Sequence, residues 1–247
     1  MISIKLSFGN IKVNNDLSLS INDVKLFGSY RRLKDLYPVL YDEIYNISEE
    51  TPLYAMYRGF YLESHKNIFK NKEIRFDLTV MANLYLGREL NKTLGHYHPI
   101  AENNLSYPEI YQVLYGKATY LLQKKINDEV IDFIIMNAKE GEAILIPPGY
   151  GHVTVNTGET ILVMANLVSN KFESIYDDYI KKRGAAYYLL KDGSLIPNKN
   201  YKKVPNFRFS SRKFLISKDL YNDFISCPSC FDFLNKPSLL SEKFFNI

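Results

Sequence analysis

The chain has 247 residues, of which 46% are hydrophobic and 23% charged, a composition that indicates a folded protein and excludes a disordered one. Thirty-one basic and 27 acidic residues give a formal net charge of +4. This charge is too small and too evenly spread to indicate a nucleic-acid partner. No run reaches the roughly 18 apolar residues of a membrane-spanning helix. The opening MISIKLSFGN lacks a signal-peptide pattern, which leaves the cytoplasm as the expected compartment.

Residues 1–74 are expected to form an N-terminal arm. An apolar series within the arm follows helical spacing, although Pro38 interrupts it: Leu33, Leu36, Leu40 and Ile44. Residues 75–206 contain short apolar runs bounded by Gly, Pro, Asn, Asp or Lys, as strands are. The predicted strands are 78–86, 110–115, 118–123, 130–136, 143–146, 153–155 and 161–168. Such closely spaced strands favour an antiparallel sandwich or barrel.

The end of the chain differs in pattern from the strand-rich middle. Asp192-Gly193 predicts a hairpin turn, because glycine accepts the positive φ that such turns require. Residues 207–247 are expected to be a short helical appendage, in which Ser217 caps a helix with Leu220, Phe224 and Ile225 on one side. No linker-like stretch separates these parts, so one domain is predicted for residues 1–247.

Two of the four histidines, His96 and His98, stand one residue apart. Side chains on a strand alternate between its faces, so both rings would point the same way and could reach one divalent ion. Taken alone, the pair is equally compatible with two exposed or hydrogen-bonded histidines, because so short a motif discriminates poorly. A metal site needs further ligands from elsewhere in the chain.

A longer pattern lies downstream, in the run GEAILIPPGYGHVTVN at residues 141–156. It consists of Gly, five residues, Pro-x-Gly, two residues, His, three residues and Asn, and it matches the second cupin motif at every defined position. Upstream, Glu109 is followed by six residues and Gly116, as at the end of the first cupin motif. The sequence resembles the cupin family, which implies an antiparallel β-barrel (a jelly roll) with a metal ion in its mouth.

The cupin resemblance implies four metal ligands: His96, His98, Glu109 and His152. Three nitrogens and one oxygen suit Fe²⁺, Mn, Ni or Zn and do not select among them. Fe²⁺ is the expected ion. Ten residues, 99–108, separate His98 from Glu109, where the motif usually has three or four, and this insertion is expected to loop out at the barrel mouth. Glu102 nearly fits the usual gap and is an alternative ligand. Glu109 is preferred, because it opens a predicted strand and has the correct spacing to Gly116.

Several phrases narrow the resemblance within the cupins. They are Thr-x-Gly-His-x-His at 93–98, Glu-Ile-Tyr at 109–111, PPGYGH and TVN within 147–156, YRRLKDL at 30–36 and PLYAMYR at 52–58. Over about residues 30–205 the chain is similar to the cupin-type phosphoglucose isomerase family of archaea and some bacteria. The resemblance implies the interconversion of glucose 6-phosphate and fructose 6-phosphate in glycolysis and gluconeogenesis, with one metal ion per chain, by a cytoplasmic homodimer.

The same resemblance implies roles for individual residues. Glu109 and His152 are the implied catalytic residues. The implied substrate-binding residues are Tyr54, Thr79, Thr93, Gly95, Tyr111 and Tyr176, of which the first four form a neutral, hydroxyl-rich phosphate pocket. Taken singly, Tyr54 and Thr79 are also compatible with ordinary sheet and core positions. Alternation along the strand is expected to turn Tyr111 away from the metal.

Some positions depart from the family pattern. Val153 stands where the family often has arginine, Gly149 replaces an aromatic residue, and no histidine follows the last predicted barrel strand. Two alternatives therefore stay open. One is a cupin oxygenase or decarboxylase that uses Fe or Mn. The other is a sugar-phosphate-binding cupin without turnover.

The remaining signals are weak. Cys227 and Cys230 have the spacing of a redox pair or of half a zinc site, but the other two ligands and the βαβ context are missing. These cysteines are therefore interpreted as incidental, without a disulfide framework. His65, in the polar run ESHKN, is expected to be a solvated surface residue.

Overall fold

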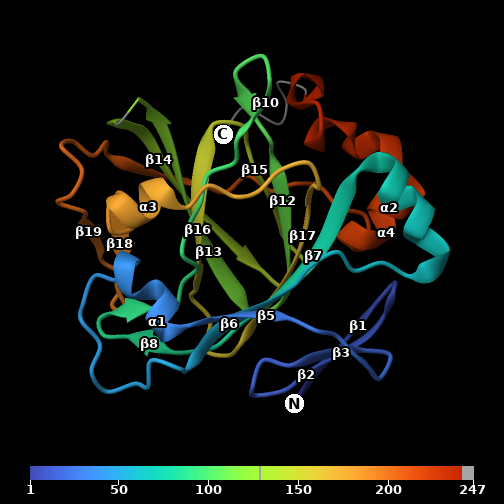
Figure 1. Ribbon diagram of the computed structural model, residues 1–247, viewed down its shortest axis with the longest axis horizontal. Coiled ribbons are helices and arrows are strands. Elements are labelled where there is room, and N and C mark those ends of the chain that lie inside the picture. Colours follow the sequence, from blue (N-terminus) through green and yellow to red (C-terminus); the bar gives the residue numbers. More distant parts are fainter. Residues whose placement is uncertain (128, 241–247) are drawn as a thin grey trace.

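The main core of the molecule lies between two β-sheets (Figure 1). The structure is a computed structural model and describes residues 1–127 and 129–240. The mainly β class predicted from the sequence is confirmed. Within the described residues, hydrogen bonds join the main strands into one six-stranded and one four-stranded sheet rather than into a single closed barrel.

The six-stranded sheet is antiparallel throughout, in the order β15-β12-β17-β7-β6-β5. Its strands are β5 (Ser29–Arg32), β6 (Pro52–Tyr57), β7 (Ile74–Met81), β12 (Glu109–Tyr115), β15 (Ala143–Ile146) and β17 (Leu162–Ser169). All residues of β17 and all but one of β7 are buried, because both faces of these central strands are covered. This explains their nearly continuous apolar sequences.

The four-stranded sheet has the order β16-β13-β14-β20, with β20 parallel to β14 and the other pairs antiparallel. Its strands are β13 (Lys117–Ile126), β14 (Glu129–Lys139), β16 (Tyr150–Asn156) and β20 (Phe207–Ser210). The strands predicted at 118–123, 130–136 and 153–155 are therefore present, with longer bounds. β20 comes from the segment that was expected to be a helical appendage.

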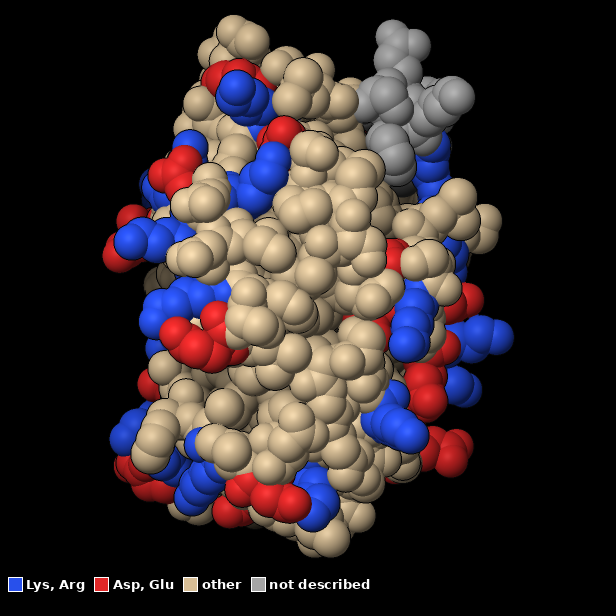
Figure 2. All heavy atoms as spheres, turned by 90° about the vertical axis from the view of Figure 1, so that its right-hand side faces the viewer, with Lys and Arg blue, Asp and Glu red and all other residues tan. Residues whose placement is uncertain are grey.

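A second hydrophobic core lies on the outer face of the six-stranded sheet. It is covered by an N-terminal sheet of β1 (Ile2–Leu6), β2 (Gly9–Val13), β3 (Leu19–Ile21) and β4 (Val24–Lys25), and by helices η2 (Glu63–His65), α2 (Lys66–Lys72), α4 (Leu220–Ser226), η3 (Pro228–Leu234) and η4 (Pro237–Leu239). The rings of Phe8 and Tyr221 lie 4.7 Å apart, so the two ends of the chain pack together here. On this side of the molecule, charged side chains lie mainly around the margin, and the middle carries few (Figure 2).

The helix predicted near the C-terminus forms, but its cap differs from the prediction. Asp219, not Ser217, is the N-cap of α4, and its side chain accepts a hydrogen bond from the backbone N–H of Asn222. Ser217 lies outside the helix and hydrogen-bonds the side chain of Asp223. Both residue types cap helices well, so the sequence alone did not distinguish them.

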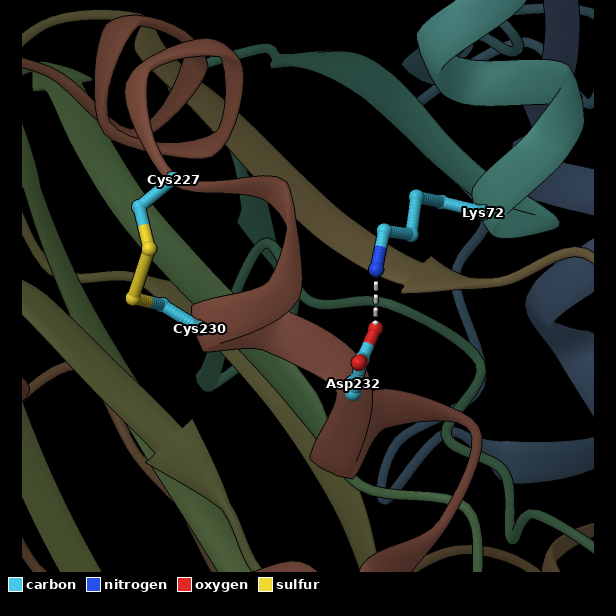
Figure 3. Close-up of a disulfide and its surroundings, with 4 residues drawn as sticks. All are labelled: Lys72, Cys227, Cys230 and Asp232. Atoms are coloured by element: carbon cyan, nitrogen blue, oxygen red, sulfur yellow. Dashed lines mark hydrogen bonds and ion pairs between the residues drawn. A yellow bond between two sulfur atoms is a disulfide. The ribbon is translucent and has the colours of Figure 1, made fainter.

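The two cysteines are joined in a disulfide between the end of α4 and η3 (Figure 3). The interpretation of Cys227 and Cys230 as incidental is therefore wrong. Two residues further on, Asp232 forms a 2.7 Å ion pair with Lys72 at the end of α2. His65 is likewise not fully solvated, since its Nδ1 lies 3.0 Å from the Tyr221 hydroxyl.

Short elements complete the described chain. They are α1 (Leu33–Leu36), η1 (Tyr37–Val39), α3 (Asp177–Lys181), and three hairpins, β8 (Tyr85–Leu86) with β9 (Glu89–Leu90), β10 (Ile100–Glu102) with β11 (Leu105–Ser106), and β18 (Tyr187–Leu189) with β19 (Leu195–Pro197). The ten-residue insertion contains the β10–β11 hairpin, and Asp192-Gly193 lies in the turn between β18 and β19. Among the described residues, no helix is long and apolar enough to span a membrane.

Candidate metal centre

His96 and His152 face each other across two neighbouring backbone segments. The chain before the β10–β11 hairpin runs antiparallel to β16, and the backbone N–H groups of His96 and His152 each donate to the other residue's carbonyl, at 3.2 and 3.0 Å. Their ring centroids lie 4.4 Å apart. The ring of His98, two residues further on, lies 5.0 Å from that of His96, as alternation along an extended segment requires.

Glu109 completes the cluster from the first position of β12. Its Oε2 lies 3.4 Å from Nε2 of His98 and 3.5 Å from Nε2 of His152. One ligand atom from each of the four predicted residues lies within 4.8 Å of the others. Glu102, the alternative ligand, is not in this cluster, because its Oε1 accepts hydrogen bonds from the N–H and the hydroxyl of Ser238.

The four side chains fit a divalent cation. Glu109 Oε2 is buried without a hydrogen-bond partner, which is costly for a carboxylate oxygen. Nε2 of His96 and Nε2 of His98 lie 3.1 Å apart, where their lone pairs repel unless a proton or a cation lies between them. Two ligands that bind one ion at about 2.1 Å lie roughly 3.0–3.4 Å apart for angles near 90–110°. Several separations in the cluster are close to this range.

The protonation states also suit a metal. Burial lowers the pKa of His96 well below its ordinary value and lowers the pKa of His152 to about 4, so both imidazoles are neutral at pH 7. Burial acts to raise the pKa of Glu109, but the proximity of His98 and His152 outweighs it, and the net pKa is lowered. Neutral imidazole and ionised carboxylate are the forms that bind metal ions.

The hairpin insertion orients one of the ligands. Nδ1 of His98 donates a 2.8 Å hydrogen bond to the carbonyl oxygen of Tyr107, at the end of the insertion. This bond places a proton on Nδ1 of His98 and directs Nε2 at the cluster. The ring of Phe172 packs against both residues, with centroids 4.5 Å from His98 and 4.7 Å from Tyr107.

The four side chains line a cavity between the sheets. The cavity has a volume of about 70 Å³, enough for several water molecules. The structure also places all six predicted substrate-binding residues in its lining: Tyr54, Thr79, Thr93, Gly95, Tyr111 and Tyr176. A small polar molecule bound in this cavity would therefore lie next to the histidine cluster.

One end of this cavity carries hydroxyl and amide groups. The Tyr54 hydroxyl accepts a 3.3 Å hydrogen bond from the N–H of Leu94. Thr93 Oγ1 accepts one of 2.9 Å from the N–H of Thr154. Gly95 has a φ of +83°, and an added Cβ would lie 2.6 Å from Tyr179. Only glycine leaves the backbone in this position next to His96 without strain.

Tyr111 corrects one expectation from the sequence. Its hydroxyl lies 3.3 Å from Nε2 of His152, so the side chain points toward the cluster and not away from it. Tyr111 follows Glu109 by two positions, and side chains two apart on a strand share a face. The expectation that Tyr111 lies on the opposite face of the strand from Glu109 was therefore wrong. Tyr111 does line the cavity, where a substrate-binding residue was expected.

Some polar residues beside the cavity were not predicted from the sequence. Arg31 pairs directly with Tyr54 between β5 and β6, and its guanidinium lies 5.8 Å from the ring centroid of Tyr176. The part of the cavity lined by Tyr54 and Tyr176 is thus flanked by a cation. Asn166 and Asp77 line the cavity from β17 and β7. Their signal in the sequence is a polar residue inside an otherwise apolar strand.

Two facing β-sheets with three histidines and a glutamate gathered in the cavity between them form the arrangement that the cupin resemblance implies, a mainly β protein with a candidate metal site. A family model described as glucose-6-phosphate isomerase matches residues 30–206. The chain belongs to the glucose-6-phosphate isomerase family.

Known proteins of that name are similar over most of the chain. The glucose-6-phosphate isomerase of Thermococcus onnurineus is 29% identical over 165 residues, which are 66% of this chain and 80% of the relative. The Thermococcus litoralis protein is 27% identical over 177 residues, 70% and 86% of the two chains. Among solved structures, an oxalate oxidase superposes with a TM-score of 0.36 at 16% identity, over 50% of this chain and 54% of that one, a similarity too partial to bear on activity.

Proposed function

We infer that this chain is a metal-dependent aldose-ketose isomerase that interconverts glucose 6-phosphate and fructose 6-phosphate. The observation that carries the inference is the convergence of three histidines and Glu109 on one point of the cavity, inside the region that the family model matches. The curated relatives carry the name of the same activity.

The reaction moves a hydrogen between C1 and C2 of an open-chain sugar. A divalent ion bound by the four ligands supplies a Lewis acid for the oxygens on these carbons. We propose Glu109 and His152 as the catalytic residues. Glu109 offers an ionised carboxylate, which can take the proton from one carbon and return it to the other. His152 faces it at 3.5 Å, and the hydroxyl of Tyr111 is placed to hydrogen-bond a sugar oxygen.

The phosphate is proposed to bind at the hydroxyl-rich end of the cavity. Tyr54, Thr79, Thr93 and Tyr176 can offer hydroxyl groups, and Gly95 a backbone N–H, to the phosphate oxygens. Arg31, behind Tyr54 and Tyr176, adds a positive charge on the side where the dianion would lie. This arrangement holds the phosphate at a distance from the reacting carbons.

The finer assignments are also proposals. The donor set accepts Fe²⁺, Mn, Ni or Zn, and we propose Fe²⁺ as the native ion. We propose a homodimer, and the scarcity of charge in the middle of the face in Figure 2 supports it. We also propose a cytoplasmic role in glycolysis and gluconeogenesis, in which the charge of a sugar phosphate would keep it from crossing a membrane unaided.

The deciding experiment is an isomerase assay on the purified protein before and after metal removal. Conversion of fructose 6-phosphate should stop after chelator treatment and dialysis, and it should return with one of Fe²⁺, Mn²⁺, Ni²⁺ or Zn²⁺. A protein with no turnover under any of these four ions would refute the proposal. Oxygen uptake or CO₂ release would indicate an oxygenase or decarboxylase, and substrate binding without turnover a non-catalytic cupin.

A further inference from the structure

Asn166 stands out in β17 as a buried polar residue within an apolar run. It is 4% exposed, and its neighbours along the strand from Leu162 to Val168 are apolar and buried. Its side chain lines the metal cavity. A buried amide at such a position requires hydrogen-bond partners, so its contacts indicate what it does.

The amide of Asn166 contacts one of the metal ligands. Its Nδ2 donates a 2.7 Å hydrogen bond to Oε1 of Glu109, and both side chains are nearly inaccessible to solvent. The other oxygen, Oε2, has no hydrogen-bond partner and is the one that faces His98 and His152. The hydrogen bond therefore makes the two oxygens of Glu109 inequivalent, with one held by the amide and one left for the cavity.

The neighbour on the other side explains why an amide stands here. Asp77, directly opposite Asn166 on β7, is 5% exposed. Its oxygens accept hydrogen bonds of 2.8 Å from Nε of Arg75 and from the N–H of Gly59. Because the Asp77 carboxylate has these hydrogen bonds, the amide of Asn166 can donate to Glu109. An amide supplies a donor between two carboxylates without adding a third negative charge.

We propose that Asn166 is a positioning residue that holds Glu109 as a ligand through a single oxygen, and that it thereby sets the affinity of the site for its ion. The proposal rests on the metal site of the proposed function. Hydrogen-bond partners of metal ligands typically contribute about 10–100-fold to metal affinity. Without the amide, Glu109 Oε1 is buried and unpaired, and the carboxylate is free to rotate away from the histidines.

The test compares the dissociation constants of the metal-free protein and its variants for Zn²⁺, measured by competition with a chromophoric chelator. Asn166→Ala and the similarly sized Asn166→Leu should both bind Zn²⁺ about 10–100-fold more weakly. Because Leu fills the space of the amide, the Zn²⁺ affinity of Asn166→Leu still tests the proposal if Asn166→Ala impairs folding. The kcat of Asn166→Leu should fall, while its KM for fructose 6-phosphate changes little, because the phosphate end is untouched.

Asn198 provides a matched control. It is 2% exposed, and its amide donates to the backbone carbonyls of Lys182 and Ala185, with no contact to the metal ligands. Asn198→Ala should lose stability but keep its Zn²⁺ affinity within about twofold of the wild type. Wild-type affinity in Asn166→Leu, or an equal loss of affinity in Asn198→Ala, would overturn the proposal. A wild-type protein that binds Zn²⁺ but does not isomerise would refute the proposed function alone, and one that binds no Zn²⁺ would refute both.

Discussion

Gly95 offers a quantitative test of the site, because the structure contains a matched control for it. Gly95 and Gly141 both have a φ of +83°. A Cβ added at Gly95 would lie 2.6 Å from atoms of Tyr179 and Val153, whereas one added at Gly141 would meet nothing within 4 Å. The two Gly→Ala substitutions therefore share the backbone strain and differ in the steric clash.

The magnitudes follow from these two contributions. An L-residue in the left-handed region costs roughly 1–2 kcal/mol, and this cost applies to both substitutions. Forcing an extra methyl group into a packed site adds typically 1–3 kcal/mol, and this cost applies to Gly95 alone. Gly95→Ala should therefore lower the free energy of unfolding by about 2–5 kcal/mol, and Gly141→Ala by about 1–2 kcal/mol.

Urea denaturation of the two variants measures this difference, and metal content measures its consequence at the site. Gly95 precedes His96, so relief of the clash would displace that ligand, and Gly95→Ala should retain less metal than Gly141→Ala. Equal losses of stability in the two variants would show that the packing around Gly95 is not as described. If Gly95→Ala is destabilised but keeps full metal content and full turnover, Gly95 does not affect the metal site.

Two further predictions use paired substitutions, and a third uses reduction of the disulfide. His152→Ala should lose most of its bound metal on dialysis and His65→Ala should not, and equal metal content measured by atomic emission would contradict the ligand assignment. Glu109→Gln should weaken metal binding and lower turnover by at least about 10²-fold. Glu102→Gln, whose side chain can still accept a hydrogen bond from Ser238, should leave metal binding and turnover unchanged. Loss of metal and turnover in Glu102→Gln but not in Glu109→Gln would make Glu102 the ligand. Reduction of the disulfide, which closes a loop over a sequence separation of three, should lower the free energy of unfolding by at most about 2 kcal/mol, and a loss of turnover on reduction would show that it supports the active site.

Much of the fold and of the ligand set could be predicted, because the relevant patterns are local. The apolar runs at 143–146 and 161–168 end at glycine, proline or polar residues, and strands form there with nearly the same bounds. His96 and His98 lie one residue apart on an extended segment, so alternation alone places both rings on one side. The spacing of the second cupin motif singled out His152, but the predicted strand began only at residue 153, whereas β16 begins at Tyr150 and includes His152.

The choice between the two glutamates shows where local patterns become insufficient. Both follow His98, and the usual spacing favours Glu102. The β10–β11 hairpin determines which glutamate reaches the cluster. Its turn places Asn103 and Asn104 in the left-handed region, with φ of 46° and 61°. This turn directs Glu102 to Ser238, which is 136 residues away, and returns the chain so that Glu109 meets His98. Contacts of such long range leave no signal in the spacing of residues.

A similar distinction separates the metal ligands from the groups that orient them. A metal ion demands particular side chains, so its ligands form a motif. The carbonyl of Tyr107 that orients His98 could come from any residue, and Asn166 reaches Glu109, 57 residues away, only because β17 pairs with β12. What marks Asn166 in the sequence is that it is polar inside a strand with no other need for polarity. Because a buried polar side chain must find a partner, isolated polar residues in apolar strands are where the supporting contacts of such a site should be sought.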